Sequence, residues 1–148
     1  MNDMQFMNLF PTTIFMKETT TVNNEELTKY LYQLEREDNK PIIKSNVGGY
    51  QSKHNLYEDV ETKELCEFII DTINNDILDD KWYKNKKSTQ DNISNMWGNI
   101  NRYGNLNVNH NHPRAWLSGA YYIKTPTNED FGNLCFLDPI ETRIYSLD

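Results

Sequence analysis

A stripe of large apolar side chains between residues 65 and 77 constrains the fold of this chain more than any other feature of its sequence. The stripe follows the three- and four-residue spacing of one helix face over about four turns. Its members are Leu65, Phe68, Ile69, Ile73 and Ile77. Asp59 or Thr62 can cap the start of this helix. Because such a face must be buried, we expect the helix to pack on a sheet and interpret the whole stripe as core.

An earlier segment predicts a second helix. Asn23 or Asn24 can cap it, and Glu25 and Glu26 suit the positive end of the helix dipole. Lys40-Pro41 ends the pattern. The apolar positions are Leu27, Tyr30, Leu31 and Leu34. We expect Met4–Lys17 to be extended, as an edge strand, and Ser45–Ser52, with its Gly48-Gly49 pair, to form a turn or irregular loop.

The pattern changes at about Met96, where short segments typical of strands alternate with Gly, Pro, Asn and Asp. The predicted strands are Trp97–Asn101, Leu106–His110, Ala115–Lys124 and Gly132–Leu137. Their spacing is typical of antiparallel sandwiches and barrels. Helices followed by sheet predict an α+β protein, with the N-terminal helices packed on a jelly-roll-like sheet.

Length and charge limit the alternatives. With 148 residues, the chain is long enough for one domain, which we divide into a helical part, 1–95, and a sheet part, 96–148. The net charge of -7 argues against a general binder of nucleic acids or anionic membranes. One basic stretch, Lys81–Lys87, carries four lysines with Trp82 and Tyr83. We interpret it as a solvated loop; a nucleic-acid contact is the alternative.

The two cysteines, Cys66 and Cys135, are too few and too scattered for a disulfide framework, so we expect reduced, buried thiols. The N-terminus lacks the pattern of a signal peptide. No stretch has the roughly 18 apolar residues of a membrane helix. We therefore expect a soluble protein of the cytoplasm.

The motif with the clearest chemistry is His110-Asn111-His112-Pro113. Positions i and i+2 of a strand point to the same side, so this H-x-H pair would direct two imidazoles at one metal. Imidazole suits iron, zinc, copper and nickel, so the pair alone does not name the metal. An isolated H-x-H is more often a surface loop. The third histidine, His54, lies in a polar segment and is expected to be solvated.

The surroundings of the pair resemble a family of iron(II)/2-oxoglutarate oxygenases of prolyl-hydroxylase-like type, found in marine bacteria and their phages. The matching segments, in chain order, are Leu9–Phe15, Gly48–Ser52, Met96–Gly104, His110–Pro113, Ser118–Ile123 and Gly132–Pro139. Each is modest by itself, but their number and order cover nearly the whole chain and make the resemblance fairly specific.

The resemblance implies a fold, a metal and a cosubstrate. The fold would be a double-stranded β-helix of the cupin or jelly-roll kind, with the helices packed on its sheet. Fe(II) would be held by His110 and His112, and 2-oxoglutarate would be the cosubstrate. Most relatives in the wider superfamily carry a carboxylate where His112 stands, although this family itself shows His. The activity implied is that of a dioxygenase acting on an unknown substrate.

Four residues are implied as cosubstrate contacts. The run Ser118-Gly119-Ala120-Tyr121-Tyr122-Ile123 is similar to one that supplies a tyrosine hydroxyl to 2-oxoglutarate. Tyr122 is therefore the candidate, with Ser118 beside it. Leu134 would form an apolar wall, and Tyr103 is a further contact. The alternative is that Tyr122 is an ordinary half-buried strand residue, because Tyr121 and Tyr122 face opposite ways and the sequence does not say which faces inward.

The chain departs from the family pattern after Asp138-Pro139, where the family continues with a distal His and then an Arg or Lys for 2-oxoglutarate. No histidine follows His112. We interpret the double-stranded β-helix as incomplete at its C-terminus. An open sheet edge invites another chain, so we expect a homodimer or a completing partner through Gly132–Leu137. The alternatives to an enzyme are a non-catalytic binding or structural module, such as a phage accessory protein, half of a split enzyme, or a simple zinc or nickel domain.

Overall fold

The computed structural model describes residues 12–78, 87–126 and 132–137. Its first helix, α1, spans Asn24–Glu37. The Asn23 side chain accepts a hydrogen bond from the Glu26 amide at 3.2 Å and thus caps the helix, as predicted. Leu27 and Leu31 are buried. The helix ends where the Asp38 amide donates to the Leu34 carbonyl at 2.9 Å, shortly before the proline.

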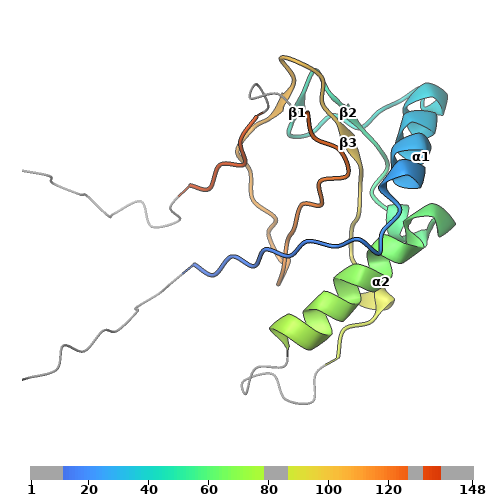
Figure 1. Ribbon diagram of the computed structural model, residues 1–148. Coiled ribbons are helices and arrows are strands. Elements are labelled where there is room, and N and C mark those ends of the chain that lie inside the picture. Colours follow the sequence, from blue (N-terminus) through green and yellow to red (C-terminus); the bar gives the residue numbers. More distant parts are fainter. Residues whose placement is uncertain (1–11, 79–86, 127–131, 138–148) are drawn as a thin grey trace, which may run out of the picture.

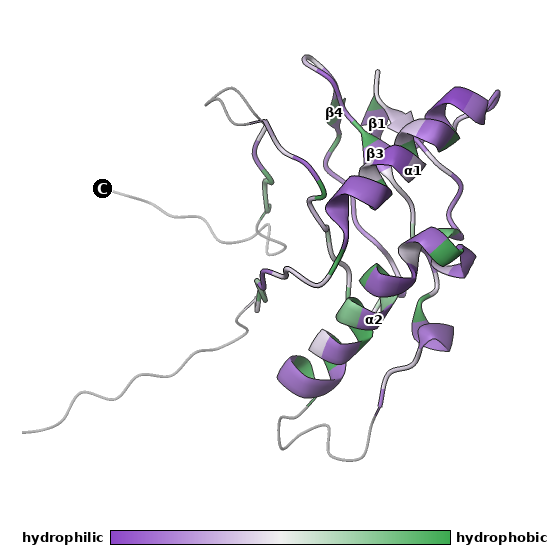
Figure 2. Cartoon of the chain, turned by 45° about the vertical axis from the view of Figure 1, so that its right-hand side comes forward, coloured by the Kyte–Doolittle hydropathy of each residue, from purple (hydrophilic) through white to green (hydrophobic). Residues whose placement is uncertain are grey.

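The second helix, α2, spans Lys63–Thr72 and continues as a π-helical turn, Ile73–Ile77. Thr62 is its N-terminal cap residue, and its buried hydroxyl donates instead to the Leu56 and Asp59 carbonyls. Hydrophobic and hydrophilic positions alternate along α2 (Figure 2). Short 3-10 helices lie before and after it, at Leu56–Glu58, Val60–Thr62 and Gln90–Asn92.

The predicted apolar stripe is buried only in part. Leu65 is buried with Val22 and Leu27, and Phe68 and Ile69 are partly buried against this core. Met96, Tyr121 and Ile123 also pack against the core, which joins the helices to the later half of the chain. Ile73 and Ile77 are only half-buried, so the prediction of full burial was wrong for the far end of the stripe. Ile77 instead lines an open groove with residues 14–17.

In the described residues, four two-residue strands form two antiparallel pairs, which follow one another along the same two segments of the chain. β1, Asn46–Val47, pairs with β4, Leu106–Asn107, and β2, Tyr50–Gln51, pairs with β3, Asn99–Ile100. Backbone hydrogen bonds at 3.0 Å and 2.8 Å extend the ladder at either end, from Ser52 to Gly98 and from Val108 to Ser45. We call residues 45–52 and 98–108 together the ribbon.

The ribbon corrects one prediction and explains another. Residues 45–52, predicted as a turn or loop, supply two strands that flank Gly48-Gly49. Gly48 has φ +77°, a left-handed conformation that favours glycine. Of the four predicted strands, Trp97–Asn101 and Leu106–His110 each contain an observed strand. Ala115–Lys124 and Gly132–Leu137 have no regular secondary structure, because the ladder hydrogen bonds of a paired neighbour are not formed there.

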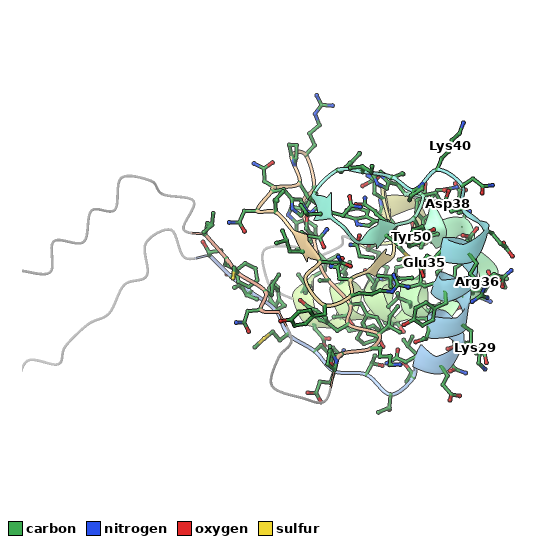
Figure 3. The ribbon with its side chains drawn as sticks, turned by 90° about the horizontal axis from the view of Figure 1, so that it is seen from above. Lys29, Glu35, Arg36, Asp38, Lys40 and Tyr50 are labelled. Atoms are coloured by element: carbon green, nitrogen blue, oxygen red, sulfur yellow. The ribbon has the colours of Figure 1, made fainter. Side chains whose placement is uncertain are left out.

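Helix α1 lies beside β2 and β3 (Figure 1), and two side-chain contacts hold it there. The Tyr50 hydroxyl donates to Asp38 Oδ2 at 3.3 Å, and Figure 3 shows Tyr50 between the ribbon and the end of α1. Arg102 pairs with Glu35 through two hydrogen bonds. Burial, together with Asp38, raises the pKa of Tyr50 to about 12. These contacts fix the side of the ribbon that faces the helix.

Several expectations lie partly outside the described residues. Residues 12–17 have no regular secondary structure, and 4–11 are not described. Most of the basic stretch Lys81–Lys87 and the Asp138-Pro139 pair also lie outside them. Within the described ranges, no helix is both long and apolar enough to cross a membrane. The expected double-stranded β-helix stays a prediction.

Candidate metal site

The two histidines of the H-x-H motif follow β4 and the last ladder hydrogen bond of the ribbon. His110 Nδ1 lies 2.7 Å from the Val108 carbonyl oxygen. A carbonyl only accepts, so Nδ1 is the donor, and in a neutral ring Nε2 would keep its lone pair. A ring nitrogen held by a backbone carbonyl while the other is left for a metal is the usual arrangement of metal-binding histidines. The contact thus leaves Nε2 as the ring nitrogen that could bind a metal.

The structure brings the two imidazoles together. The ring centroids of His110 and His112 are 4.9 Å apart, and the rings are nearly perpendicular at 78°. Two imidazoles that bind one metal at about 2.1 Å, at right angles or slightly wider, have ring centres about 4.5–5 Å apart. Both side chains are exposed and accessible to an ion from solvent. The separation is therefore compatible with a shared metal.

A strained turn follows the pair. The Ala115 amide donates to the His112 carbonyl at 3.2 Å, which closes a four-residue turn with Pro113 and Arg114 at its centre. Arg114 has φ +72°, a left-handed conformation at a turn position that normally takes glycine or asparagine. Proline before it fits the preceding turn position. The turn limits the backbone freedom of His112 from its C-terminal side.

Sequence reasoning missed two residues beside the pair. The Trp97 ring lies 5.5 Å from the His112 ring and 5.0 Å from the His54 ring, measured between centroids. His54 was predicted to be solvated, and this was wrong: it is half-buried and 2.9 Å from the amide nitrogen of Gln51. Burial lowers the pKa of His54, with a smaller contribution from Lys44. The tryptophan was part of the matching Met96–Gly104 segment, but no signal in the sequence connected His54 to it.

The structure answers which of the paired tyrosines faces the helices. Tyr121 packs on Phe68 at 6.3 Å between ring centroids and donates from its hydroxyl to Asn24 Oδ1 at 2.8 Å. Tyr122 is 58% exposed, whereas Tyr121 and Ile123 on either side are half-buried. Tyr121, and not Tyr122, is therefore the tyrosine that packs against the helices.

The remaining candidates are all exposed. Ser118 is exposed, Leu134 is 58% exposed, and Tyr103 is 97% exposed in the turn between Arg102 and Asn105. Their role as cosubstrate contacts stays a prediction. Cys135, expected to be buried, is exposed, so that prediction was wrong; Cys66 is buried, and both thiols are free.

The donor set in the described part of the chain consists of the two imidazoles. Among residues 12–78, 87–126 and 132–137, no group of three or more His, Cys, Asp and Glu side chains could hold a metal ion. His110 and His112 thus fit two of the three protein positions that non-haem iron sites use. They could hold a metal weakly by themselves, or firmly with one more ligand.

A comparison with known protein families matches the segment that contains the pair. The family model described as "Putative 2OG-Fe(II) oxygenase" matches residues 95–147. The match includes the histidine pair, Trp97 and all four cosubstrate candidates, and excludes the two helices. No curated protein and no solved structure matches the chain. Residues 95–147 are therefore similar to the 2-oxoglutarate/Fe(II) oxygenase family.

Proposed function

We propose that this chain carries the metal-binding part of an Fe(II)/2-oxoglutarate-dependent dioxygenase, with Fe(II) held by His110 and His112. The observation that carries the proposal is the geometry of the pair, 4.9 Å between ring centroids, inside the segment that matches the oxygenase family. The carbonyl of Val108 supports it, because it occupies His110 Nδ1 and leaves Nε2 as the nitrogen that could bind the metal. When bound, Fe(II) supplies O2 activation, coupled to decarboxylation of 2-oxoglutarate to succinate and hydroxylation of a substrate C–H bond.

In this proposal Tyr122 and Ser118 orient the cosubstrate. Tyr122 is 58% exposed and is not among the residues packed on the core, so its side chain is available to a carboxylate of 2-oxoglutarate. Leu134 would pack against the carbon chain of the cosubstrate. Tyr103 would be a further contact, from the turn between the two ribbon strands. The exposure of all four residues requires that a further layer covers them in the active protein.

The same exposure supports a partner. Leu106, in β4, and Val108 precede His110 and His112 at the same two-residue spacing, and both apolar side chains are about half exposed. Leu134, Phe136 and Leu137 are 58–69% exposed. These three residues lie within four positions of the chain, and contiguous exposed apolar surface marks interaction sites. We propose that a second copy or a completing chain pairs along Gly132–Leu137 and completes the double-stranded β-helix. A protein that light scattering shows to be monomeric at high concentration would argue against it.

One observation favours a second function, that of a non-catalytic metal-binding module. The described residues offer two ligands and no third, and two imidazoles suit zinc or nickel as well as iron. A binding or structural module would retain the pair without turning over 2-oxoglutarate. The two functions differ in whether 2-oxoglutarate joins the metal.

An anaerobic titration with Fe(II), with and without 2-oxoglutarate, tests the proposal. The enzyme predicts a weak visible charge-transfer band that requires both additions and is lost in His110→Ala. Tyr122→Phe should lower the affinity for 2-oxoglutarate, so that more of it is needed to produce the band, while metal binding is unchanged. A folded protein that binds the metal but shows no band with 2-oxoglutarate supports the second function. Absence of metal binding would contradict both.

A further inference from the structure

We infer that Trp97 is a positioning residue for the metal-binding pair. It packs against His54, which supports it, and against His112, whose ring it orients. The inference rests on the proposed function for its purpose, because it concerns the ligand that the metal would use. The three rings lie in series along the chain of contacts His54, Trp97 and His112, with centroid separations of 5.0 Å and 5.5 Å. Separations of this size are those of packed aromatic pairs.

The backbone on both sides of Trp97 is fixed to one segment. The Met96 amide donates to the His54 carbonyl at 2.8 Å, and the Met96 carbonyl accepts from the Leu56 amide at 3.1 Å. On the other side, the Gly98 amide donates to Ser52 Oγ at 3.0 Å. The Ser52 amide returns a hydrogen bond to the Gly98 carbonyl at 3.0 Å. Because the backbone of Met96 and of Gly98 is hydrogen-bonded in this way, the backbone position from which the Trp97 side chain extends is fixed.

His54 supports the indole and is unsuited to be the third ligand. Its Nε2 accepts a hydrogen bond from the Gln51 amide nitrogen at 2.9 Å, and Gln51 is 2% exposed. The lone pair that a metal would need is thereby used, and the ring is neutral with its proton on Nδ1. A buried amide therefore fixes the imidazole that packs on Trp97.

His112 depends on this support more than His110 does. His110 is oriented by the Val108 carbonyl, whereas the His112 ring has no hydrogen-bond partner among the described residues. Its ring contacts are aromatic, with Trp97 and with His110. Removing the indole would free the His112 side chain to rotate, and a metal would then have to immobilise it. Supporting residues of metal ligands typically change metal affinity by about tenfold or more.

The first arm of the test needs no metal. Imidazole NMR signals of His112 in the metal-free protein should show a ring-current shift that is lost in Trp97→Leu and largely kept in Trp97→Phe. Trp116→Leu is the matched control and should leave the shift in place. His54→Ala should reduce it, because the indole loses its support. Unchanged His112 signals in a folded Trp97→Leu protein would overturn the inference.

The second arm is anaerobic binding of Co(II), used in place of Fe(II) for its visible absorption. Trp97→Leu should bind about tenfold more weakly than the wild type, and Trp97→Phe should recover most of the affinity. Equal affinity in Trp97→Leu and the wild type would also overturn the inference. If the wild type binds no Co(II) although the ring-current shift is present, the proposed function is contradicted, whereas the contact by which Trp97 orients His112 is confirmed. Circular dichroism confirms that each variant is folded.

Discussion

Arg102 and Glu35 form a bidentate ion pair that holds the ribbon against α1. The distances are 2.6 Å from Nη1 to Oε1 and 2.8 Å from Nη2 to Oε2. The planar guanidinium matches both carboxylate oxygens at once, which adds geometric specificity to the charge interaction. The pair joins residues far apart in the sequence and so fixes where the turn after β3 lies on the helix.

This pair predicts a pH dependence. The hydrogen bonds and charge of Arg102 lower the pKa of Glu35 below its usual value of 4.5. A lowered pKa in the folded state gives stability that is present above about pH 4.5 and is lost as the pH falls through the folded value. Glu35→Gln should therefore reduce the urea midpoint at neutral pH, and the difference should shrink in acid. Glu37→Gln, on the same helix, is the control. An equal effect at both pH values would contradict the prediction.

Gly98→Ala should destabilise the protein by about 1–3 kcal/mol, because a side chain there has no space. An added Cβ would clash with the end of Leu31 and lie 3.1 Å from its Cδ1, and Leu31 is itself buried. Gly119→Ala is the matched control, since an added Cβ there would meet nothing within 4 Å. Urea unfolding measures both. Equal urea midpoints for the two variants would show that Leu31 of α1 does not pack closely against Gly98.

Arg114→Gly should stabilise the protein by about 1 kcal/mol, because glycine adopts a positive φ without the strain that a side chain brings. Glycine also gains freedom in the unfolded chain, which offsets part of the effect. Thermal unfolding measures the change. Arg114→Lys keeps the charge and the strain and should match the wild type. A lower melting temperature for the glycine variant would mean that the arginine side chain makes a stabilising contact that outweighs the strain.

The two thiols should differ in reactivity. Cys135 is exposed, whereas Cys66 is buried and burial raises its pKa, which lowers the fraction of reactive thiolate. A thiol reagent should modify one cysteine quickly in the folded protein and the second only on unfolding. Cys135→Ser should remove the fast phase. A fast phase that survives in Cys135→Ser would contradict the burial of Cys66.

His54 predicts a loss of stability in mild acid. Burial lowers its pKa below the usual 6.5, so the unfolded chain binds its proton first as the pH falls. The stability from neutral His54 is complete above about pH 6.5 and declines below it towards the folded pKa. His54→Gln should flatten the pH dependence of the urea midpoint in this range. An unchanged slope in the variant would show that another group is responsible.

The local parts of the fold could be predicted because their signals are local. Asn23 caps α1 by accepting a hydrogen bond from the backbone amide three residues later. The apolar spacing from Leu65 onward identifies α2 without reference to the rest of the chain. The H-x-H pair is local in the same sense, since its two rings lie two residues apart in the chain and 4.9 Å apart in space. Full burial of the stripe could not be predicted, because it depends on which later segments cover the far end of α2.

The sequence by itself determined the helices, the identity of the two candidate ligands and the resemblance to the oxygenase family. Only the tertiary structure decided what surrounds those ligands. His54 reaches Trp97 because ladder hydrogen bonds bring residues 52–56 against 96–98, and Tyr121 rather than Tyr122 meets the helices because Asn24 and Phe68 lie there. Such contacts join segments whose separation along the chain carries no periodic signal, so they follow from pairing and packing and not from local pattern.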